Sequence, residues 1–288
     1  MMSGGLQYQF ARLSIAEKLI AINVLIFLLD GLSGALLGHS FSQWFLLPKD
    51  FFEFLAQPWS LVTYSFFHGG FGHIFWNMIV LYFASRIFLN LFDAQRFINV
   101  YFLGLMLGGL VFLLSYNVFP TLVNSNTALI GASAGVNAVL IFVCAYLPNQ
   151  EVRVIFFNIK LWYIGAALVI KDLVLIGMGD NIGGGMAHLG GAFLGYMYAR
   201  QLFKGHDIGA GFTKLRNTIG GLFKPKEEKK APLKTVYKKR TATKSKKDYD
   251  KQAKQRKIDT ILDKISKSGY ESLSKEEKDF LFKAGKED

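Results

Sequence analysis

The stretch Gly131-Ala132-Ser133-Ala134-Gly135 opens the apolar run 136–143 near the middle of this 288-residue chain. It places a serine hydroxyl at the head of a hydrophobic segment, among residues small enough to leave room for a substrate carbonyl beside backbone N–H groups. Small-residue clusters are also common where membrane helices pack closely, so the stretch alone favours a structural role. A catalytic role for Ser133 requires a neighbouring base, which the rest of the chain must supply.

Hydrophobic residues make up 51% of the chain and are concentrated before Lys204. Backbone groups cannot stay unpaired in lipid, so long apolar runs are expected to be helices. Six runs approach or reach the ~20 residues that cross a hydrocarbon core, and they lie at 19–37, 72–90, 97–116, 132–147, 161–178 and 186–203. The sequence therefore predicts an all-α membrane protein with a six-helix bundle over 19–204, preceded by a cytoplasmic segment 1–18.

Charge is distributed unevenly along the chain. The first 204 residues carry a net charge of +2 and the remaining 84 carry +10. Lysines and arginines of the first part lie on the side of the bundle that holds both termini, whereas the opposite loops hold essentially Lys49 alone. This bias predicts cytoplasmic N- and C-termini and places Ser133 and His188 at the outer ends of their helices.

Two non-helical stretches are expected on the outer side. Segment 41–67 is too broken by prolines and charges to span, and Trp44 and Trp59 are expected to anchor it in the interface. Segment 177–185 is glycine-rich and directly precedes a candidate catalytic histidine. We expect it to be mobile, as a gate or as an ordinary flexible loop.

The chain has one cysteine, Cys144, which excludes an intrachain disulfide and a cysteine-based metal cluster. Three of the five histidines, His68, His73 and His188, fall at the outer ends of predicted helices. Ionisable groups at membrane depth are costly and are therefore functional candidates. No metal site and no cofactor are predicted.

His188 can serve as the base. Gly191 and Gly195 lie three and seven positions after it, on the same helical face. Glycines at this spacing let two helices approach closely. If the partner helix is the one that begins at Ser133, the two side chains come within hydrogen-bonding reach, and Ser–His can act as nucleophile and general base.

His73 and Asn77 share one face of the second long helix, four positions apart. An imidazole N–H and an amide N–H pointing the same way suit an oxyanion. The alternatives are a packing histidine and an interhelical hydrogen bond from the asparagine.

Together these motifs resemble the rhomboid intramembrane serine proteases, and His68 and Trp59 also fall at that family's spacings. The resemblance covers roughly 19–203. It implies cleavage of transmembrane protein substrates, with Ser133 as nucleophile and His188 as general base. It further implies an oxyanion site formed by His73, Asn77 and the Ser133 N–H. Four other residues would support the site, namely His68, Gly131, Gly191 and Gly195.

Three positions depart from the family pattern. Ala134 follows the serine where glycine is usual, Asn137 stands where many members have an aromatic residue, and Ser60 stands where many have arginine. These changes keep a second class open, a non-catalytic member that binds membrane clients. A small transporter or channel is a third class, but few paired charges occur at mid-membrane positions.

A rival interpretation is the nucleophile elbow of α/β-hydrolases. Gly131-x-Ser133-x-Gly135 matches it, and Asp172 and Asp180 precede His188, so the order Ser, Asp, His is also present. That elbow requires a strand before the serine and a soluble sheet around it, which this apolar chain does not predict. Asp172, beside Lys171, is expected to form a buried hydrogen bond or ion pair.

The tail divides into a basic segment over 205–256 and a hairpin over 257–288. A short amphipathic helix over 205–221 is expected on the inner membrane surface. Segment 224–257 is expected to be disordered and to attract anionic lipids of the bilayer, and not nucleic acid. An apolar stripe at 258–265 and a capping box at Ser274 predict two helices.

This hairpin resembles the C-terminal segment of rhomboid-like proteins of Bacteroidetes type, which implies a bacterial inner membrane and a possible role in docking a protein partner.

Overall fold

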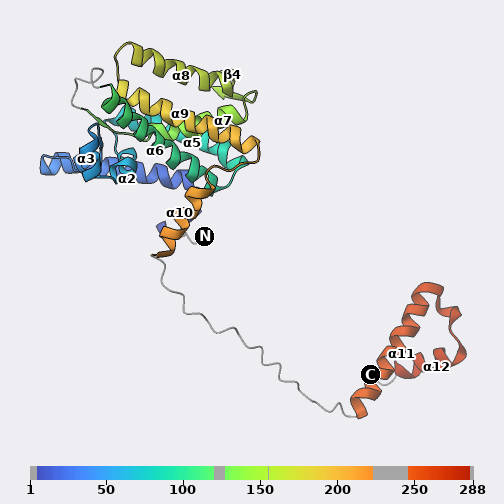
Figure 1. The fold of residues 1–288 in the computed structure, drawn as a ribbon. Helices are drawn as coiled ribbons and strands as arrows, with labels where there is room; N and C mark the ends of the chain where they lie inside the picture. Colours follow the sequence, from blue (N-terminus) through green and yellow to red (C-terminus); the bar gives the residue numbers. More distant parts are fainter. Residues whose placement is uncertain (1–4, 120–126, 155, 223–245, 286–288) are drawn as a thin grey trace. The chain divides into compact units, whose positions relative to one another are not determined.

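The computed structural model describes residues 5–119, 127–154, 156–222 and 246–285. The chain divides into two compact units, Met1–Lys224 and Pro225–Asp288 (Figure 1). The first unit is a helical bundle that carries every candidate catalytic residue. The second is a small helical hairpin. The segment expected to be a disordered basic linker falls mainly on 223–245, outside the described residues.

The six helices expected from the apolar runs are all present. A short α1 (Leu6–Arg12) precedes them, and they are α2 (Ile15–Leu37), α5 (Phe71–Leu91), α6 (Ala94–Val118), α7 (Ser133–Tyr146), α8 (Leu161–Gly177) and α9 (Ile182–Phe203). Polar caps fix several of their starts. Ser14 and Glu17 form a reciprocal capping box at the start of α2, and the Asp93 carboxylate accepts a hydrogen bond from the Arg96 N–H in α6.

Three helices within the described residues, α2, α5 and α6, are long and apolar enough to cross a membrane. By the same measure α7, with 14 residues, and α8, with 17, are too short, and the glycine-rich α9 is not apolar enough. The all-α expectation is confirmed, and the exact number of six spanning helices stays a prediction.

The start of α9 differs from the expectation. Segment 177–185 was predicted to be a mobile loop, but its last four residues are helical, because the Asn181 side chain caps the first turn by accepting from the Gly184 N–H. The glycine at 183 also permits close packing, since a Cβ there would lie 2.8 Å from Phe112. The loop between α8 and α9 is therefore short.

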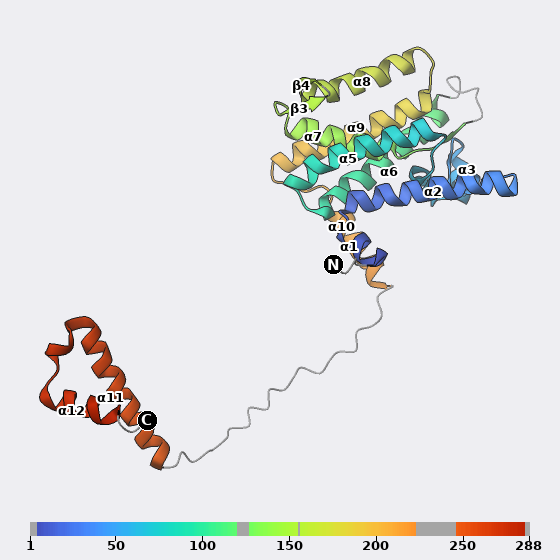
Figure 2. The same ribbon diagram turned by 180° about the vertical axis from the view of Figure 1, so that it is seen from behind.

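Helix α7 lies at the centre of the bundle and packs against α5, α6, α8 and α9 (Figure 2). Most of its residues after Ser133 are buried. Small residues permit this arrangement. A Cβ on Gly104 of α6 would collide with the Ala138 methyl group, and one on Gly191 of α9 would collide with the Ala134 carbonyl oxygen. The helix that starts at the candidate nucleophile is thus the most enclosed element.

The segment between α2 and α5 is made of short pieces, as its prolines and charges predict. They are η1 (Ser42–Trp44), β1 (Leu47–Pro48), α3 (Phe51–Ala56), α4 (Ser60–Thr63) and η2 (Tyr64–Phe66). Strand β1 pairs antiparallel with β2 (Ala128–Leu129), with Leu47 opposite Leu129. The indole N–H of Trp59 donates to the Trp44 carbonyl oxygen at 2.9 Å. The β1–β2 pair ties this segment to the approach to Ser133.

An antiparallel hairpin joins α7 to α8 and consists of β3 (Glu151–Val154) and β4 (Phe157–Lys160). After α9, polar contacts hold helix α10 (Ala210–Leu222) and the residues just before it to α6. The Asn99 amide donates to Thr213 Oγ1 at 2.8 Å, and Arg96 forms an ion pair with Asp207. The expected amphipathic helix is present, beginning at 210 rather than 205.

The second unit contains α11 (Lys246–Ser268), η4 (Tyr270–Ser272) and α12 (Lys275–Ala284). The capping box predicted at Ser274 is present, with Glu277 as its partner. Lys264 of α11 bonds Glu277 at 2.8 Å and lowers the pKa of that carboxyl group. Helix α11 begins at Lys246, so the first eleven residues of this helix occupy positions expected to belong to a linker.

Candidate active site

Ser133 is the first residue of α7, and a tight turn brings the chain to it. Gly131 has φ +115°, a conformation that side-chain-bearing residues rarely adopt, and a Cβ there would lie 2.6 Å from the His73 ring. The Gly131 N–H donates to the Tyr64 carbonyl oxygen at 3.1 Å. Both the backbone conformation at position 131 and the closeness of the His73 ring therefore require a glycine there.

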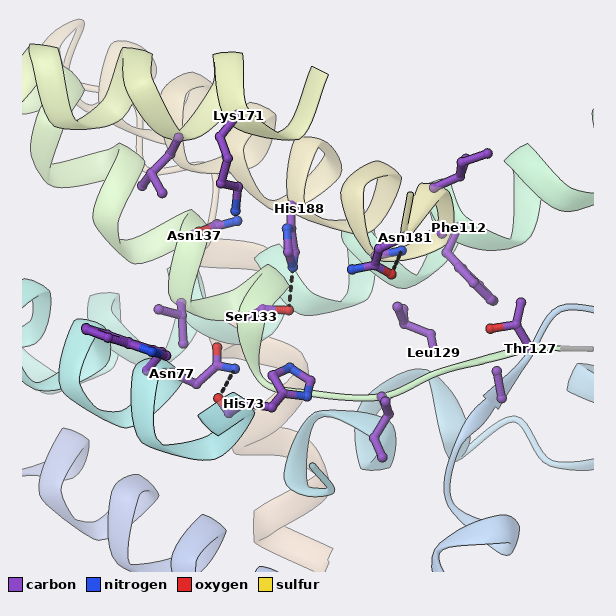
Figure 3. Close-up of a pocket in the computed structure, with 18 of the residues that line it drawn as sticks. His73, Asn77, Phe112, Thr127, Leu129, Ser133, Asn137, Lys171, Asn181 and His188 are labelled. Atoms are coloured by element: carbon purple, nitrogen blue, oxygen red, sulfur yellow. Dashed lines mark hydrogen bonds between the residues drawn. The ribbon is translucent and has the colours of Figure 1, made fainter. Parts of the chain in front are cut away.

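The structure brings Ser133 and His188 together, as the sequence predicts. Ser133 Oγ lies 2.8 Å from His188 Nε2, on α7 and α9 respectively (Figure 3). The close contact of the two helices depends on Gly191 and Gly195, because a Cβ on either would collide with a carbonyl oxygen of α7. The two glycines thus act through helix spacing, as expected for positions that support the site.

A third group, which the sequence analysis did not assign to the site, completes this arrangement. Asp172 of α8 places its Oδ1 atom 3.0 Å from His188 Nδ1, and its side chain is only 4% exposed. Lys171 Nζ lies 3.0 Å from the same oxygen. The expectation of a buried hydrogen bond or ion pair at Asp172 was correct, but its partner in the active site was missed.

These contacts fix the tautomer of the imidazole. An ionised carboxylate only accepts hydrogen bonds, so His188 Nδ1 carries the hydrogen and donates to Asp172. His188 Nε2 is then free to accept from the Ser133 hydroxyl. This is the arrangement in which a histidine removes a proton from a serine nucleophile while a carboxylate orients the ring and stabilises its charged form.

His73 and Asn77 face Ser133 from α5, on the side of the pocket away from His188 (Figure 3). The Asn77 amide donates to the His73 carbonyl oxygen at 2.9 Å within its own helix. Since an amide carries two N–H hydrogens, one remains for an oxyanion. The expected oxyanion residues therefore line the same pocket as Ser133, with Asn77 partly engaged by its backbone.

His68 lies behind this side of the site and is 6% exposed. Its Nε2 atom accepts a hydrogen bond from the Ala132 N–H at 3.4 Å, and its ring meets that of His73 edge to face. His68 therefore contacts both the turn before Ser133 and a predicted oxyanion residue. This placement fits the supporting role expected for it.

A cavity of about 750 Å³ is lined by Ser133, His188, His73 and Asn77. Its walls come from α5, α6, α7, α8, α9 and the strand before Ser133, and Lys171 and Asn137 both line it. Trp76 of α5 and Leu168 of α8 are also among its lining residues. Such a concave, partly polar cavity is typical of a binding site.

The departures from the family pattern have structural consequences. The extra methyl group of Ala134 packs on Gly108 of α6, where a Cβ would lie 2.6 Å away. Asn137 lines the cavity. The Ser60 hydroxyl is buried without a hydrogen-bond partner among the described residues. None of these positions displaces Ser133 from His188.

Among the described residues, no group of three or more histidine, cysteine or carboxylate side chains could hold a metal ion. Cys144 is buried and unpaired by any disulfide in that part of the chain. The groups gathered around Ser133 are those of nucleophilic catalysis.

Replacing Asp172 with asparagine tests the third group. The amide no longer stabilises a positive imidazole, and it can hold the ring in the wrong tautomer, so the rate at which a fluorophosphonate labels Ser133 should fall roughly 10²- to 10⁴-fold. The rate is measured in detergent, with Asp180→Asn as control because Asp180 is exposed in the loop before α9. If Asp172→Asn is labelled at the same rate as the wild type, Asp172 does not assist His188 and has only a structural role.

Comparison with known proteins supplies a family. The Rhomboid domain family matches residues 55–205, and a family of unknown function matches 245–284. The chain is 31% identical over 173 residues to RHOMBOID-like protein 12, mitochondrial, of Arabidopsis thaliana, covering 56% of this chain and 51% of that protein. It is 29% identical over 157 residues to Presenilin-associated rhomboid-like protein, mitochondrial, of Homo sapiens, covering 54% and 39%.

A similar likeness, 28% over 151 residues, links it to Presenilin-associated rhomboid-like protein A, mitochondrial, of Danio rerio, with 51% of this chain and 38% of that protein covered. The chain thus spans about half the length of these relatives, or less. The matched family covers more than half of the chain and includes every candidate catalytic residue. The chain is an integral membrane protein of the rhomboid family.

Proposed function

We propose that the protein is an intramembrane serine endopeptidase that cleaves transmembrane segments near the outer membrane face. The observation that carries the proposal is the 2.8 Å contact between Ser133 Oγ and His188 Nε2. A serine is a poor nucleophile unless a base removes its proton, and the proposed base, His188, lies within hydrogen-bonding distance of it. Asp172, bonded to the other ring nitrogen, strengthens the case.

The reaction proceeds through an acyl-enzyme. Ser133 Oγ attacks the substrate carbonyl carbon while its proton passes to His188 Nε2, and the resulting oxyanion faces His73, Asn77 and the Ser133 N–H. His188 then gives the proton to the leaving amine as the peptide bond breaks. Water, activated by the same imidazole, attacks the acyl carbon and releases Ser133.

The substrate is proposed to be a transmembrane segment, which would enter between α5 and α8, because Trp76 of α5 and Leu168 of α8 line the cavity that holds Ser133. A substrate helix must unwind to present a carbonyl group, and unpaired backbone is tolerated only beside protein or water. The cavity offers polar partners for such backbone, among them Asn137 and Lys171.

The orientation and compartment remain predictions from the sequence. Both termini are expected on the cytoplasmic side, with Ser133 near the outer face of a bacterial inner membrane. The relatives above are named as mitochondrial, which is a statement about those proteins.

Cleavage in proteoliposomes tests the function directly. The full chain is reconstituted with a single-span protein labelled at both ends, and the products are identified by mass spectrometry. Two fragments whose junction lies in the outer third of the span support the proposal. An uncut substrate that stays bound to the folded protein would favour the alternative, a client-binding rhomboid protein, which the departures at Ala134 and Asn137 keep open.

Removing residues 225–288 should leave the reactivity of Ser133 within about two-fold of the full chain, because every site residue lies in the first unit. We expect instead a loss of association with a protein partner of the hairpin. The labelling rate and the proteins that co-purify are measured for both forms. Unchanged co-purifying proteins in the truncated form would remove the partner-docking role, and a large loss of labelling would contradict the independence of the two units.

A further inference from the structure

A second cavity lies between α7, α8 and α9, and Ala192, Phe193 and Leu189 of α9 line it, whereas these residues do not line the cavity that contains Ser133. It has a volume of about 690 Å³. Ile141 and Cys144 of α7, and Val169 and Ile170 of α8, form further parts of its wall. We refer to this cavity as the α8 groove.

The floor of the α8 groove is closed by a helix contact. A Cβ on Gly165 of α8 would lie 3.0 Å from the Cys144 Cβ atom of α7, so these two helices touch there. Around this point the lining residues Ala145, Ala166 and Ala192 are small and leave space above the floor. The groove is therefore a shallow channel between three helices.

One end of the α8 groove differs in chemistry from the rest. Arg200 of α9 is the only charged residue in its lining, and it is exposed. Among the residues that the structure describes, no carboxylate forms an ion pair with it. Trp162 and Tyr196, which are 44% and 49% exposed, line the same end. A cation beside aromatic residues with polar edges is typical of the boundary between headgroups and hydrocarbon.

We propose that the α8 groove binds a glycerophospholipid with an anionic headgroup, from the leaflet on the side where α8 begins and α9 ends. The phosphodiester lies at Arg200, and an acyl chain follows the apolar wall towards Ile170. From Trp162 to Ile170 the helix rises ~12 Å, which is close to the ~15 Å depth of one hydrocarbon leaflet. The charge and the length of the groove both match this ligand.

A transmembrane helix of another protein fits the α8 groove less well. A packed helix is ~10 Å wide, and Gly165 of α8 would have to move away from Cys144 of α7 to admit it between the two helices. A wider opening would require α7 and α8 to separate at Gly165, where they are in contact. A flexible acyl chain needs no such movement.

Such a lipid would also rest on a helix of the candidate active site. Val169 and Ile170 of α8 line the groove, and Leu168 and Lys171 line the cavity around Ser133. The lipid site itself does not depend on the proposed proteolytic function, and its test requires no enzymatic activity.

Quenching of Trp162 by brominated lipids provides the test. The chain has four tryptophans, so the fluorescence of Trp162 is obtained as the difference between the wild type and Trp162→Phe. The full chain is reconstituted in vesicles that contain equal fractions of brominated phosphatidylglycerol or brominated phosphatidylcholine. We expect the anionic lipid to quench Trp162 at least two-fold more strongly than the zwitterionic lipid.

Two substitutions locate the effect. Arg200→Gln should make the two lipids equivalent, and Ala166→Phe, which fills the groove, should reduce quenching by both. Arg86→Gln is the matched control, because Arg86 is an exposed arginine of α5 that contacts Tyr82 and does not line the groove. The Arg86→Gln protein retains both Arg200 and the basic tail, so the anionic lipid should still quench Trp162 more strongly than the zwitterionic lipid.

Equal quenching by the two lipids in the wild type would overturn the proposal. A preference that survives in Arg200→Gln would also overturn it, by assigning the effect to the basic tail. Protection of Trp162 from both lipids would mean that protein occupies the groove and would likewise contradict it.

Discussion

Substitution of Ser133 by alanine is expected to abolish labelling of the protein by a fluorophosphonate, and so is substitution of His188 by alanine. The first change removes the nucleophile, and the second removes the base that lies 2.8 Å from it. When nucleophile and base act as a unit, loss of either costs nearly as much as loss of both. We expect cleavage of a membrane substrate to fall at least ~10⁴-fold in each variant.

Labelling is measured in detergent on protein that elutes as a single species. Ser115→Ala is the matched control, because Ser115 is a buried serine of α6 whose hydroxyl donates to the Val111 carbonyl oxygen. It should label like the wild type. Persistent labelling of Ser133→Ala would show that another serine reacts, and a folded wild type without labelling would contradict the catalytic assignment.

Substitution of Gly195 by alanine is expected to destabilise the bundle severely. The new Cβ atom would collide with the Ala138 carbonyl oxygen on α7, and a backbone atom in a central helix cannot move aside easily. Overpacking of a rigid contact costs ~1–3 kcal/mol or more. For a unit of this size, that corresponds to a fall of roughly 2–12 °C in the unfolding temperature.

Gly34→Ala provides the control, because Gly34 of α2 has open space around its Cβ position. Alanine is a better helix former than glycine, so this variant should match or exceed the wild type. Thermal unfolding is followed by circular dichroism in one detergent for all three proteins. Equal unfolding temperatures for Gly195→Ala and the wild type would mean that α7 and α9 are less closely packed than described.

Much of this architecture could be predicted from the sequence because membrane helices have strong signals. Long apolar runs bounded by charged residues located six helices to within a few residues. Ser133 and His188 stand at the heads of two of these runs, and Gly191 and Gly195 lie along one face, so their contact was predicted on the condition that these two helices are partners. The glycine spacing along α9 is a local property of the sequence, whereas the choice of α7 as its partner helix is not.

Asp172 could not be placed in the same way. Its partner is on another helix, and which face of α8 turns towards His188 depends on the packing of three helices. The signal was present as a carboxylate inside an apolar run, in the order serine, aspartate, histidine. That order alone is typical of the soluble α/β-hydrolase fold and does not indicate a position in a helical bundle.

Two helix starts were missed for opposite reasons. The glycines at the start of α9 favour loops, but a cap from Asn181 and close packing made them helical. The lysine-rich start of α11 resembles a disordered segment in composition, although lysine, glutamine and alanine are good helix formers. At the start of α9, the cap and the packing outweighed the low helix propensity of glycine. At the start of α11, the helix propensity of the residues themselves was underestimated.

The Lys171–Asp172 pair also has a consequence for how the chain enters its membrane during synthesis. A lysine or an aspartate at the centre of a nascent helix costs ~2.5–3.5 kcal/mol on translocon insertion, and α8 has only 17 residues to offset two of them. The cost falls once the carboxylate meets both Lys171 and His188. Helix α8 is therefore expected to remain in the translocon until α9 is made. The two helices would then enter the lipid together as a hairpin, in which His188 of α9 is bonded to the Asp172 carboxylate of α8.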